Sequence, residues 1–356
     1  MNRREFLRYA AAFWFTTSSG QKQAFAESVP GKKGKSLPEG MLVIDAHAHP
    51  DQFYYLGAPG RIDRSSTLEQ IGALGMNASS FAALGDESNF NFVLHQLDYV
   101  LRLESRGKVK VVRSFQDLPY DVEQERFVPG AILALESGHA LDGPQTALDR
   151  LDAAYQKGVR MLTLIHKRDN QLGQSMDIHV YGDGTGLSGL GRQVVERMIS
   201  LGMIIDVAHA HFATLKDITD IAIAHSVPVV DSHTSLIPAP ARVPTRRRTW
   251  QEMEMVARTG GVICTWPLKV STGAYKRTTI RDWAEENLAT AKRIGNEHVG
   301  LGTDGGGLLP ERVEGYDNIL DLPKLIDAMS RAGFPRGEID NYMGKNFFRV
   351  IKRILR

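Results

Sequence analysis

Cysteine is nearly absent from this chain of 356 residues. Cys264 is the only one, so the chain cannot form an internal disulfide bond. It lies in the apolar run 261–264, where a buried and unreactive thiol is the usual outcome. Stability must therefore come from a large apolar core, and a chain of this length can bury one.

The N-terminal region lacks a hydrophobic stretch long enough to span a membrane. Its apolar stretch from Tyr9 to Phe15 is too short for that. The stretch follows the pair Arg3-Arg4 and precedes Ala24-Phe25-Ala26, whose small residues a signal peptidase can recognise. This order predicts a twin-arginine signal peptide. The alternative is a basic and frayed N-terminus.

The signal-peptide interpretation assigns residues 1–26 to the leader, with cleavage near Ala26. We expect the twin-arginine translocation machinery to be a partner during export, and the mature protein to be periplasmic or secreted. No cysteine that could accept a lipid lies near the cleavage position, and residues 351–356 are basic rather than a hydrophobic tail. The mature protein is therefore expected to have no membrane anchor.

A large excess of charge of one sign is also missing. The chain has 43 Lys and Arg against 41 Asp and Glu, and removal of residues 1–26 takes the net charge from +2 to near −1. A near-neutral chain has no electrostatic basis for binding nucleic acid or an anionic membrane, so neither is expected as a partner. The basic run Arg246–Arg248 is expected to be a solvated loop.

Residues 27–40 contain no periodic apolar pattern and are predicted to be a linker. After them, short apolar runs typical of buried parallel strands alternate with helical patterns. The eight strand candidates are residues 41–45, 77–83, 131–136, 160–165, 203–206, 227–231, 261–265 and 299–303, with an extra short strand at 108–113. Clear helical patterns cover residues 90–101 and 190–201, and Gly202 after the second is a C-cap signal.

Eight strands that alternate with helices over about 300 residues favour one α/β domain, a closed (β/α)8 TIM-type barrel. This barrel is predicted to take up residues 41–356, since the sequence shows no internal repeat and no second domain. A doubly wound open sheet is the alternative fold. It would not explain why polar residues follow so many of the strand candidates.

Histidines and carboxylates stand at the ends of the apolar runs. They are His47, His49, Glu136, His166, His209, His233 and Asp304. The carboxyl ends of barrel strands meet on one face, where such enzymes carry their chemistry. Imidazoles and carboxylates gathered there can hold a divalent metal ion. The pattern therefore predicts a metal-dependent hydrolase.

The spacing of these residues suggests how the metal is held. His47 and His49 are two positions apart, so in an extended segment both imidazoles can reach one ion. The alternative for this pair is two ordinary histidines near the surface. Glu136 offers two oxygens and can bridge two cations, while His209 and His233 can bind the second.

Three further residues are candidates for work on the substrate. Asp304 can orient the attacking water and accept its proton, although Asp-Gly is also a common turn. His166 can stabilise the oxyanion of a tetrahedral intermediate. Arg242 is a candidate to bind a substrate carboxylate, because a guanidinium matches that group well.

From about Met41 to its end, the chain resembles the renal or membrane dipeptidase family of metallopeptidases. The resemblance is carried by several separate motifs in family order. They are residues 158–164 before His166, 186–191 together with 201–209, 231–235 around His233, 242–244 beginning at Arg242, and 343–350.

This resemblance implies a (β/α)8 barrel with two zinc ions that share one carboxylate, and hydrolysis of dipeptides, in some members with a D-residue in the second position. It implies that His47 and Glu136 bind one ion and that Glu136, His209 and His233 bind the other. His166, Arg242 and Asp304 take the roles given above. The resemblance also favours a homodimer.

Two departures from the family pattern fall at the site. The family has Asp at the position of His49, so the first metal site loses a negative charge, although zinc still accepts imidazole. After Asp304 the family has Phe-Asp-Gly, whereas this chain has Gly305-Gly306-Gly307. That change is expected to widen or loosen one wall of the pocket.

The leading hypothesis is a dipeptidase in which a hydroxide between two divalent metal ions attacks the amide carbonyl. The first alternative is an amidohydrolase of the same fold that acts on another amide or a lactone, since the His-x-His pattern resembles that wider superfamily. The second is a catalytically silent binding protein that keeps the scaffold.

Overall fold

The computed structural model describes residues 36–50, 66–86, 89–119, 127–142, 146–271 and 275–356. The predicted signal peptide, residues 1–26, and residues 27–35 of the predicted linker lie outside this part of the chain. Within it, no helix is both long and apolar enough to cross a bilayer.

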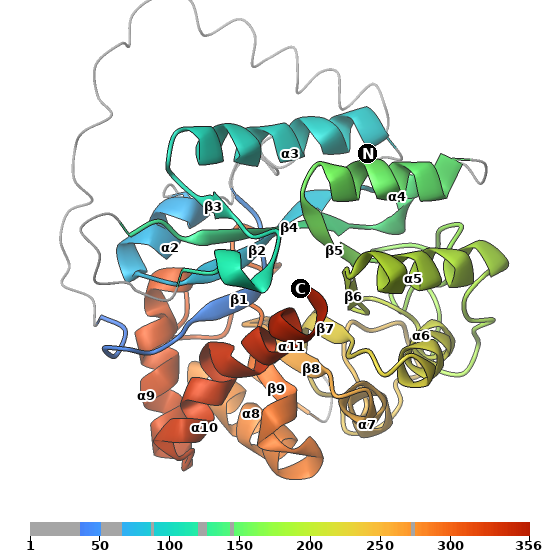
Figure 1. Cartoon of the computed structure of the whole chain (residues 1–356). Helices are drawn as coiled ribbons and strands as arrows, with labels where there is room; N and C mark the ends of the chain where they lie inside the picture. The colour runs from blue at the N-terminus through green and yellow to red at the C-terminus, as the bar shows by residue number, and fades with distance from the viewer. Residues whose placement is uncertain (1–35, 51–65, 87–88, 120–126, 143–145, 272–274) are drawn as a thin grey trace, which may run out of the picture.

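The described strands form one parallel sheet that closes on itself into a barrel (Figure 1). The path is β1-β2-β4-β5-β6-β7-β8-β9, and the short β3 pairs with β4 beside this path. The strands are β1 Ile44–Ala48, β2 Ala78–Leu84, β3 Lys110–Val111, β4 Gly130–Glu136, β5 Val159–Thr163, β6 Ile204–Asp206, β7 Val230–Thr234, β8 Val262–Thr265 and β9 Val299–Leu301. The predicted (β/α)8 barrel is confirmed, and residues 108–113 do contain the extra strand.

The barrel closes where β1 meets the segment that follows β9. Ala48 forms a parallel bridge with Gly305. The amide of His49 donates to the carbonyl of Gly305 at 2.6 Å, and the amide of Asp304 donates to the carbonyl of His47 at 2.9 Å. The contact therefore joins two segments from opposite ends of the sequence.

Helices surround the barrel and connect successive strands (Figure 1). They are α2 Thr67–Leu74, α3 Phe90–Ser105, α4 Ala147–Gln156, α5 Gly189–Leu201, α6 Phe212–Ala224, α7 Trp250–Arg258, α8 Ile280–Ile294, α9 Leu322–Ala332, α10 Arg336–Asp340 and α11 Asn346–Ile354. Short 3-10 helices lie at Phe115–Asp117, Gly138–Leu141, Asn296–His298 and Ile319–Asp321, and a π-helical turn at Asn341–Lys345 precedes α11.

Helix α5 shows how the sequence defines these elements. The Ser188 side chain accepts a hydrogen bond from the amide of Gly191 and begins the helix. Gly202 ends it with φ of 69°, in the left-handed region that favours glycine. Val194 and Val195 are buried between these ends. The predicted helix 190–201 and its C-cap are thus confirmed.

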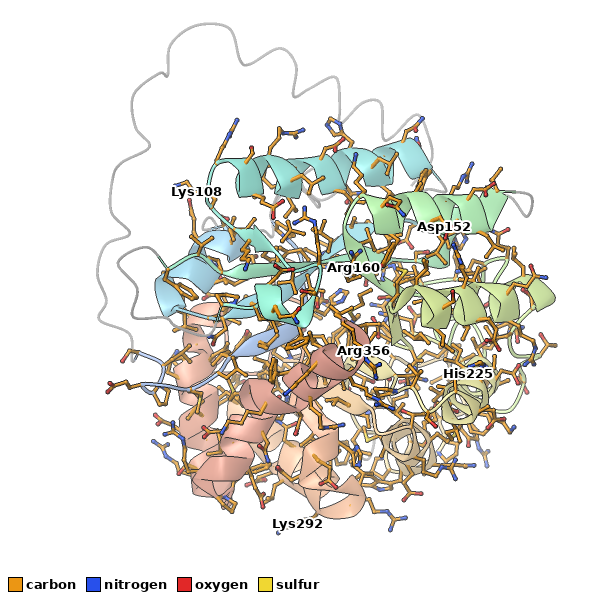
Figure 2. All side chains as sticks on the ribbon, viewed as in Figure 1. Lys108, Asp152, Arg160, His225, Lys292 and Arg356 are labelled. Carbon is orange, nitrogen blue, oxygen red and sulfur yellow. The ribbon has the colours of Figure 1, made fainter. Side chains whose placement is uncertain are left out.

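Helix α11 covers the end of the barrel where the strands begin, and in Figure 1 it lies across them. Its side chains Phe347, Val350 and Ile351 share an apolar cluster with the first inward residues of the strands, among them Ile44 and Ile132. Figure 2 places Arg160 and Arg356 on this same face. The opposite end, where the strands finish, is left for polar groups.

Cys264 belongs to this apolar cluster and is buried. Burial raises the pKa of its thiol well above the usual range, which keeps the thiol protonated and unreactive. The expectation of a buried thiol is confirmed.

The basic run 246–248 is not a simple solvated loop. The Arg248 side chain is fully buried, donates to Asp231 at 2.6 Å and to Glu252 at 3.1 Å, and also binds the carbonyls of Val207 and Ala210. The expectation is wrong for this residue because two buried carboxylates and two carbonyls replace the water that its guanidinium leaves behind.

Candidate metal centre

The register of the barrel strands brings the polar strand ends to one level. Glu136, the last residue of β4, lies opposite Leu84 of β2 and Thr163 of β5. Six other predicted site residues gather around Glu136, and all seven are buried. They are His47 in β1, His49 directly after it, Glu136, His166 after β5, His209 after β6, His233 in β7 and Asp304 after β9.

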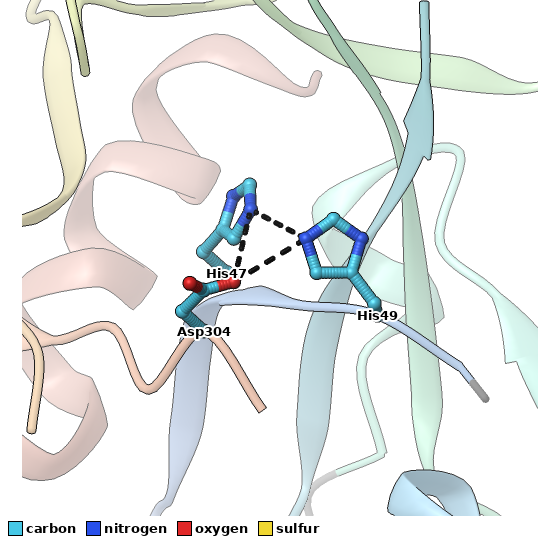
Figure 3. Close-up of side chains that lie close together, drawn as sticks. All are labelled: His47, His49 and Asp304. Atoms are coloured by element: carbon cyan, nitrogen blue, oxygen red, sulfur yellow. Dashed lines mark hydrogen bonds and ion pairs between the residues drawn. The ribbon is translucent and has the colours of Figure 1, made fainter. Parts of the chain in front are cut away.

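One half of this cluster lies where β1 meets the end of β9 (Figure 3). The Nε2 atoms of His47 and His49 are 3.1 Å apart. Each faces Glu136, with His47 Nε2 3.4 Å from Oε1 and His49 Nε2 3.5 Å from Oε2. Asp304 Oδ1 is 3.3 Å from His49 Nε2 and 4.0 Å from His47 Nε2.

The other half lies on the far side of Glu136. The Nε2 atoms of His209 and His233 are 2.8 Å apart. Glu136 Oε1 is 3.8 Å from His233 Nε2 and 3.4 Å from His166 Nε2. The Glu136 carboxylate thus stands between two groups of imidazoles, which is the position a bridging ligand requires.

The outer nitrogens of His49 and His233 are held by other groups, and this aims their Nε2 atoms inward. The carbonyl of Ala82 lies 3.0 Å from His49 Nδ1. The Ser232 hydroxyl lies 2.9 Å from His233 Nδ1 and donates its proton to Asp206 at 2.7 Å. Ser232 can then only accept from Nδ1–H of His233, which leaves the inward Nε2 without a proton and ready to bind a metal.

The cluster fits a divalent metal ion. Glu136 Oε2 is buried without a hydrogen-bond partner in the described part of the chain. Donor atoms on one tetrahedral zinc ion lie about 3.3 Å apart, given zinc–ligand bonds of about 2.0 Å. Three groups of three donors lie close enough to share an ion: His47, His49 and Asp304; His47, Glu136 and His233; Glu136, His166 and His209.

The metal-free cluster holds opposite charges next to each other. Burial works to raise the pKa of Glu136, but the imidazoles of His166 and His47 hold that pKa well below its usual range. Burial likewise works to lower the pKa of His47, yet the Glu136 carboxylate raises it to about 9. His233 differs, because burial and then the charge of His47 lower its pKa well below the usual value.

Arg242 is the one predicted site residue without a described contact to the cluster. Its side chain is exposed in the loop between β7 and α7. Neither a hydrogen bond nor an ion pair joins it to a cluster residue within the described ranges. Arg246 of the same loop is linked to the cluster through Asp177, since its Nε donates to Asp177 at 2.8 Å and Asp177 Oδ2 is 3.6 Å from His209 Nδ1. A role for Arg242 therefore stays a prediction.

Two carboxylates beside the cluster, Asp86 and Asp177, were not predicted from the sequence. Asp86 lies 2.8 Å from His166 Nδ1 and orients that ring. Asp177 lies 3.6 Å from the outer ring nitrogen, Nδ1, of His209. Asp86 follows a predicted strand, 77–83, to which no site residue had been assigned, so the strand-end rule could have found it. Asp177 lies far from any strand end, and only tertiary structure reveals it.

The three glycines after Asp304 are tightly packed, and the expectation of a wider pocket wall stays a prediction. A Cβ at Gly306 would overlap the carbonyl of His49, and one at Gly307 would overlap the Asp304 carboxylate. A Cβ at Gly305 would press on Ile319. Any side chain at these positions would therefore require the neighbouring atoms to shift.

Comparison with known proteins places these features in context. Residues 66–355 match the family model described as membrane dipeptidase, peptidase family M19. Dipeptidase tcpJ of Claviceps purpurea is 29% identical over 208 residues, which are 56% of this chain and 46% of that protein. The chain spans about half the length of the first curated relatives it matches.

Two solved structures share the fold. A metallopeptidase from Rhodobacter sphaeroides, bound to a phosphinate mimic of the dipeptide L-Ala-D-Ala, has a TM-score of 0.72 at 18% identity, covering 89% of this chain and 100% of its own. The probable dipeptidase PvdM from Pseudomonas aeruginosa has a TM-score of 0.71 at 17% identity, covering 99% of both chains.

Proposed function

We propose that this chain, which belongs to the membrane dipeptidase family, peptidase family M19, hydrolyses the amide bond of dipeptides. The reaction would use two divalent metal ions, and zinc is the expected metal. The observation that carries this proposal is Glu136 standing between two groups of inward-facing imidazoles. His47, His49 and Glu136 would hold the first ion, and Glu136, His209 and His233 the second. Bound there, the ions would polarise the substrate carbonyl and supply a hydroxide between them.

His166 is proposed to stabilise the oxyanion. Its Nε2 lies 3.4 Å from Glu136 Oε1, at the edge of the cluster where a scissile carbonyl would arrive. Asp86 accepts from Nδ1 at 2.8 Å and fixes the ring. Asp304 is proposed to orient the attacking water and accept its proton, since its Oδ1 lies 3.3 Å from His49 Nε2 in the same cluster.

The free carboxylate of a dipeptide requires a cationic partner. Arg242 is proposed for this from the resemblance, and Arg246 is a second candidate because the structure places it near His209, with Asp177 between them. The dipeptide mimic in the Rhodobacter sphaeroides metallopeptidase supports testing an L,D dipeptide as well as L,L substrates.

A second candidate function is hydrolysis of another amide or a lactone that has no free carboxylate. Such a substrate would not need Arg242, which is exposed and has no described contact with the cluster. A silent binding protein is the third candidate, and it differs from both by showing no turnover when loaded with metal.

Export of the protein is proposed from the sequence alone. The twin-arginine pattern within residues 1–26 supports translocation and a periplasmic or secreted location after cleavage near Ala26. A homodimer is proposed from the family resemblance alone. N-terminal sequencing of the protein recovered from the periplasm or medium tests the cleavage position.

The deciding experiment measures amino-acid release by residues 27–356 reconstituted with zinc. The panel holds L,L and L,D dipeptides, each with an N-blocked and a C-amidated version. A dipeptidase cleaves the free dipeptides and loses activity on amidation. Equal cleavage of the amidated substrates points to the wider amidohydrolase function, and cleavage of none points to another substrate or a binding protein.

Matched variants then locate the carboxylate partner. The residue that binds the substrate carboxylate should raise KM for free dipeptides when changed, with little effect on an amidated substrate. Arg242→Met and Arg246→Met are compared in the same assay. An unchanged KM in Arg242→Met would remove that residue from the site.

A further inference from the structure

Asp304 lies beside the two imidazoles of the proposed first metal site. Its Oδ1 is 3.3 Å from His49 Nε2 and 4.0 Å from His47 Nε2, and the two Nε2 atoms are 3.1 Å apart. Donors on one tetrahedral zinc ion lie about 3.3 Å apart, so a small shift of the Asp304 carboxylate toward His47 completes the geometry. In Figure 3 one carboxylate oxygen faces both imidazoles while the other points away.

The backbone holds Asp304 in this position at some conformational cost. Its φ is 49°, a left-handed conformation that non-glycine residues rarely adopt and that persists only when the surroundings impose it. On one side, its amide donates to the carbonyl of His47 at 2.9 Å. On the other, its carbonyl accepts from the amide of Gly307 at 2.9 Å.

The glycine turn is what allows this arrangement. A side chain at position 307 would collide with the Asp304 carboxylate, and one at position 306 would collide with the backbone of His49. Gly306 also has φ of 75°, which favours glycine. The two departures from the family pattern, His49 and the three glycines, are therefore in direct contact with each other.

The charge at the first metal site connects the two departures. With His47 and His49 both neutral, the first ion would face only a share of the single charge of Glu136. A carboxylate at position 304 restores the negative charge that is missing at position 49. Together with Glu136, it gives the ion two nitrogen and two oxygen donors, a set that zinc accepts.

We propose that Asp304 is a ligand of the first metal ion through Oδ1, replacing the carboxylate that this chain lacks at position 49. The inference rests on the proposed two-metal site and deepens it. Asp304 Oδ2 remains the oxygen available for proton transfer.

Metal binding by Asp304→Asn tests the proposal without any need for a substrate. Bound zinc is measured by elemental analysis after dialysis, and affinity by competition with a chelator. We expect the variant to keep one tightly bound ion and to bind the other more than 100-fold less tightly. Loss of a mere hydrogen-bond partner of a ligand typically costs about 10–100-fold. Two ions held with wild-type affinity would overturn the proposal.

Two controls separate coordination from general damage. Asp177→Asn removes a carboxylate that supports His209 from outside and should weaken the other ion by the smaller factor. Glu311→Gln changes an exposed carboxylate paired with Lys269 and should leave both ions in place. Circular dichroism confirms that each variant is folded. If Asp177→Asn lost the same ion as Asp304→Asn to the same extent, a specific ligand role would be excluded.

A double variant tests the replacement directly. His49→Asp restores a carboxylate at the family's position, so Asp304→Asn should cost much less in that background than in the wild type. Equal cost in both backgrounds would contradict the proposal. Visible spectra of the cobalt-substituted proteins give a second measure, because loss of a carboxylate ligand changes the d–d bands of one ion.

The outcomes also distinguish this inference from the proposed function. If no dipeptide is cleaved but Asp304→Asn loses an ion, the coordination stands and the dipeptidase proposal fails. If dipeptides are cleaved and Asp304→Asn retains both ions, the dipeptidase proposal stands and this inference fails. A wild-type protein that binds no metal overturns both.

Discussion

At the scale of single residues, His47 and Glu136 decide how the site takes up metal. Their side chains approach to 3.4 Å, and this pairing raises the pKa of His47 to about 9. The metal-free protein therefore carries an imidazolium where a metal ligand is needed. Metal uptake must displace that proton.

We predict that zinc affinity rises about tenfold per pH unit between pH 6.5 and 8.5, because one proton leaves His47 as the ion binds. The sign follows from the raised pKa: protonated His47 cannot coordinate, so affinity falls as pH drops below about 9. His209 and His233 add no further dependence in this range, because burial lowers their pKa. Chelator competition at several pH values measures the slope, and a flat profile would contradict the prediction.

The second prediction concerns Glu136→Gln. An amide cannot bridge two cations as a carboxylate does, so bound zinc should fall below two per chain and turnover should be lost. Elemental analysis and the dipeptide assay measure both, with Glu311→Gln as the exposed control. Retention of both ions and full activity would rule out the shared carboxylate.

Residues differed in how well the sequence predicted them. His47, Glu136, His166, His209, His233 and Asp304 could be named because each follows or ends an apolar run, and parallel strands bring such positions together. Arg242 and Arg248 sit in a long loop, where neighbours depend on tertiary contacts rather than on any periodic pattern. Composition made Arg248 look solvated, but its partners, Asp231 and Glu252, become visible only in the folded chain.

At the scale of elements, the loop between β7 and α7 is anchored by Arg248. Its guanidinium reaches Asp231 in β7, Glu252 in the first turn of α7, and the carbonyls of Val207 and Ala210 after β6. His209 and His233 lie within these same segments. The arginine thus fixes the segments of two proposed metal ligands, His209 and His233, relative to each other.

We predict that Arg248→Met lowers the free energy of unfolding by about 3–5 kcal/mol, the usual cost of breaking a buried charge pair. Even beside Arg248, burial raises the pKa of Asp231 to about 6. Without the arginine that pKa rises further, so the cost of either protonating Asp231 or burying its unpaired charge grows between pH 5 and pH 8. Destabilisation should therefore be larger at pH 8.

Denaturant unfolding of the metal-free proteins at both pH values measures this difference. Arg281→Met serves as the control, because Arg281 is 81% exposed in its pair with Glu285, and should cause little change. An Arg248→Met variant as stable as the control would show that the buried pairs contribute nothing.

The sequence predicted the presence of the strands better than the residues at which they begin. Residues 41–45 and 227–231 were expected to be strands, and the observed β1 and β7 begin three residues later, at Ile44 and Val230. Apolar character marks where a segment is buried, but hydrogen bonding to the neighbour sets where pairing begins. Val43, for example, is engaged by the side chain of Asn77 before β1 starts.

At the scale of the whole molecule, the barrel has an apolar floor under α11 and a polar mouth around the metal-binding cluster. The barrel itself was predictable because eight strand candidates alternate with helices. Closure of the barrel was less predictable, because it depends on the contact between β1 and the segment after β9. Residues 41–50 and 299–307 carry no local signal for that contact.

Because the ligands come from strands all around the barrel, metal removal should destabilise the whole domain. We expect zinc at about 100 times its Kd to add about 2.7 kcal/mol per site, and chelation to lower Tm by several degrees. Calorimetry with and without chelator measures the change. Glu136→Gln should respond less to chelation, and an identical Tm with and without zinc in the wild type would contradict a bound metal.

The seam of the barrel has a consequence for synthesis of the protein. Thr303 donates to Asp45 across 258 positions of sequence, and Asp304 meets His47 and His49 at the same place. A nascent chain that has not yet released residue 304 from the ribosome cannot assemble this pocket. Under the proposed function, zinc bound by the complete pocket would therefore distinguish finished molecules from partial ones, and metal insertion would follow the synthesis of residue 304.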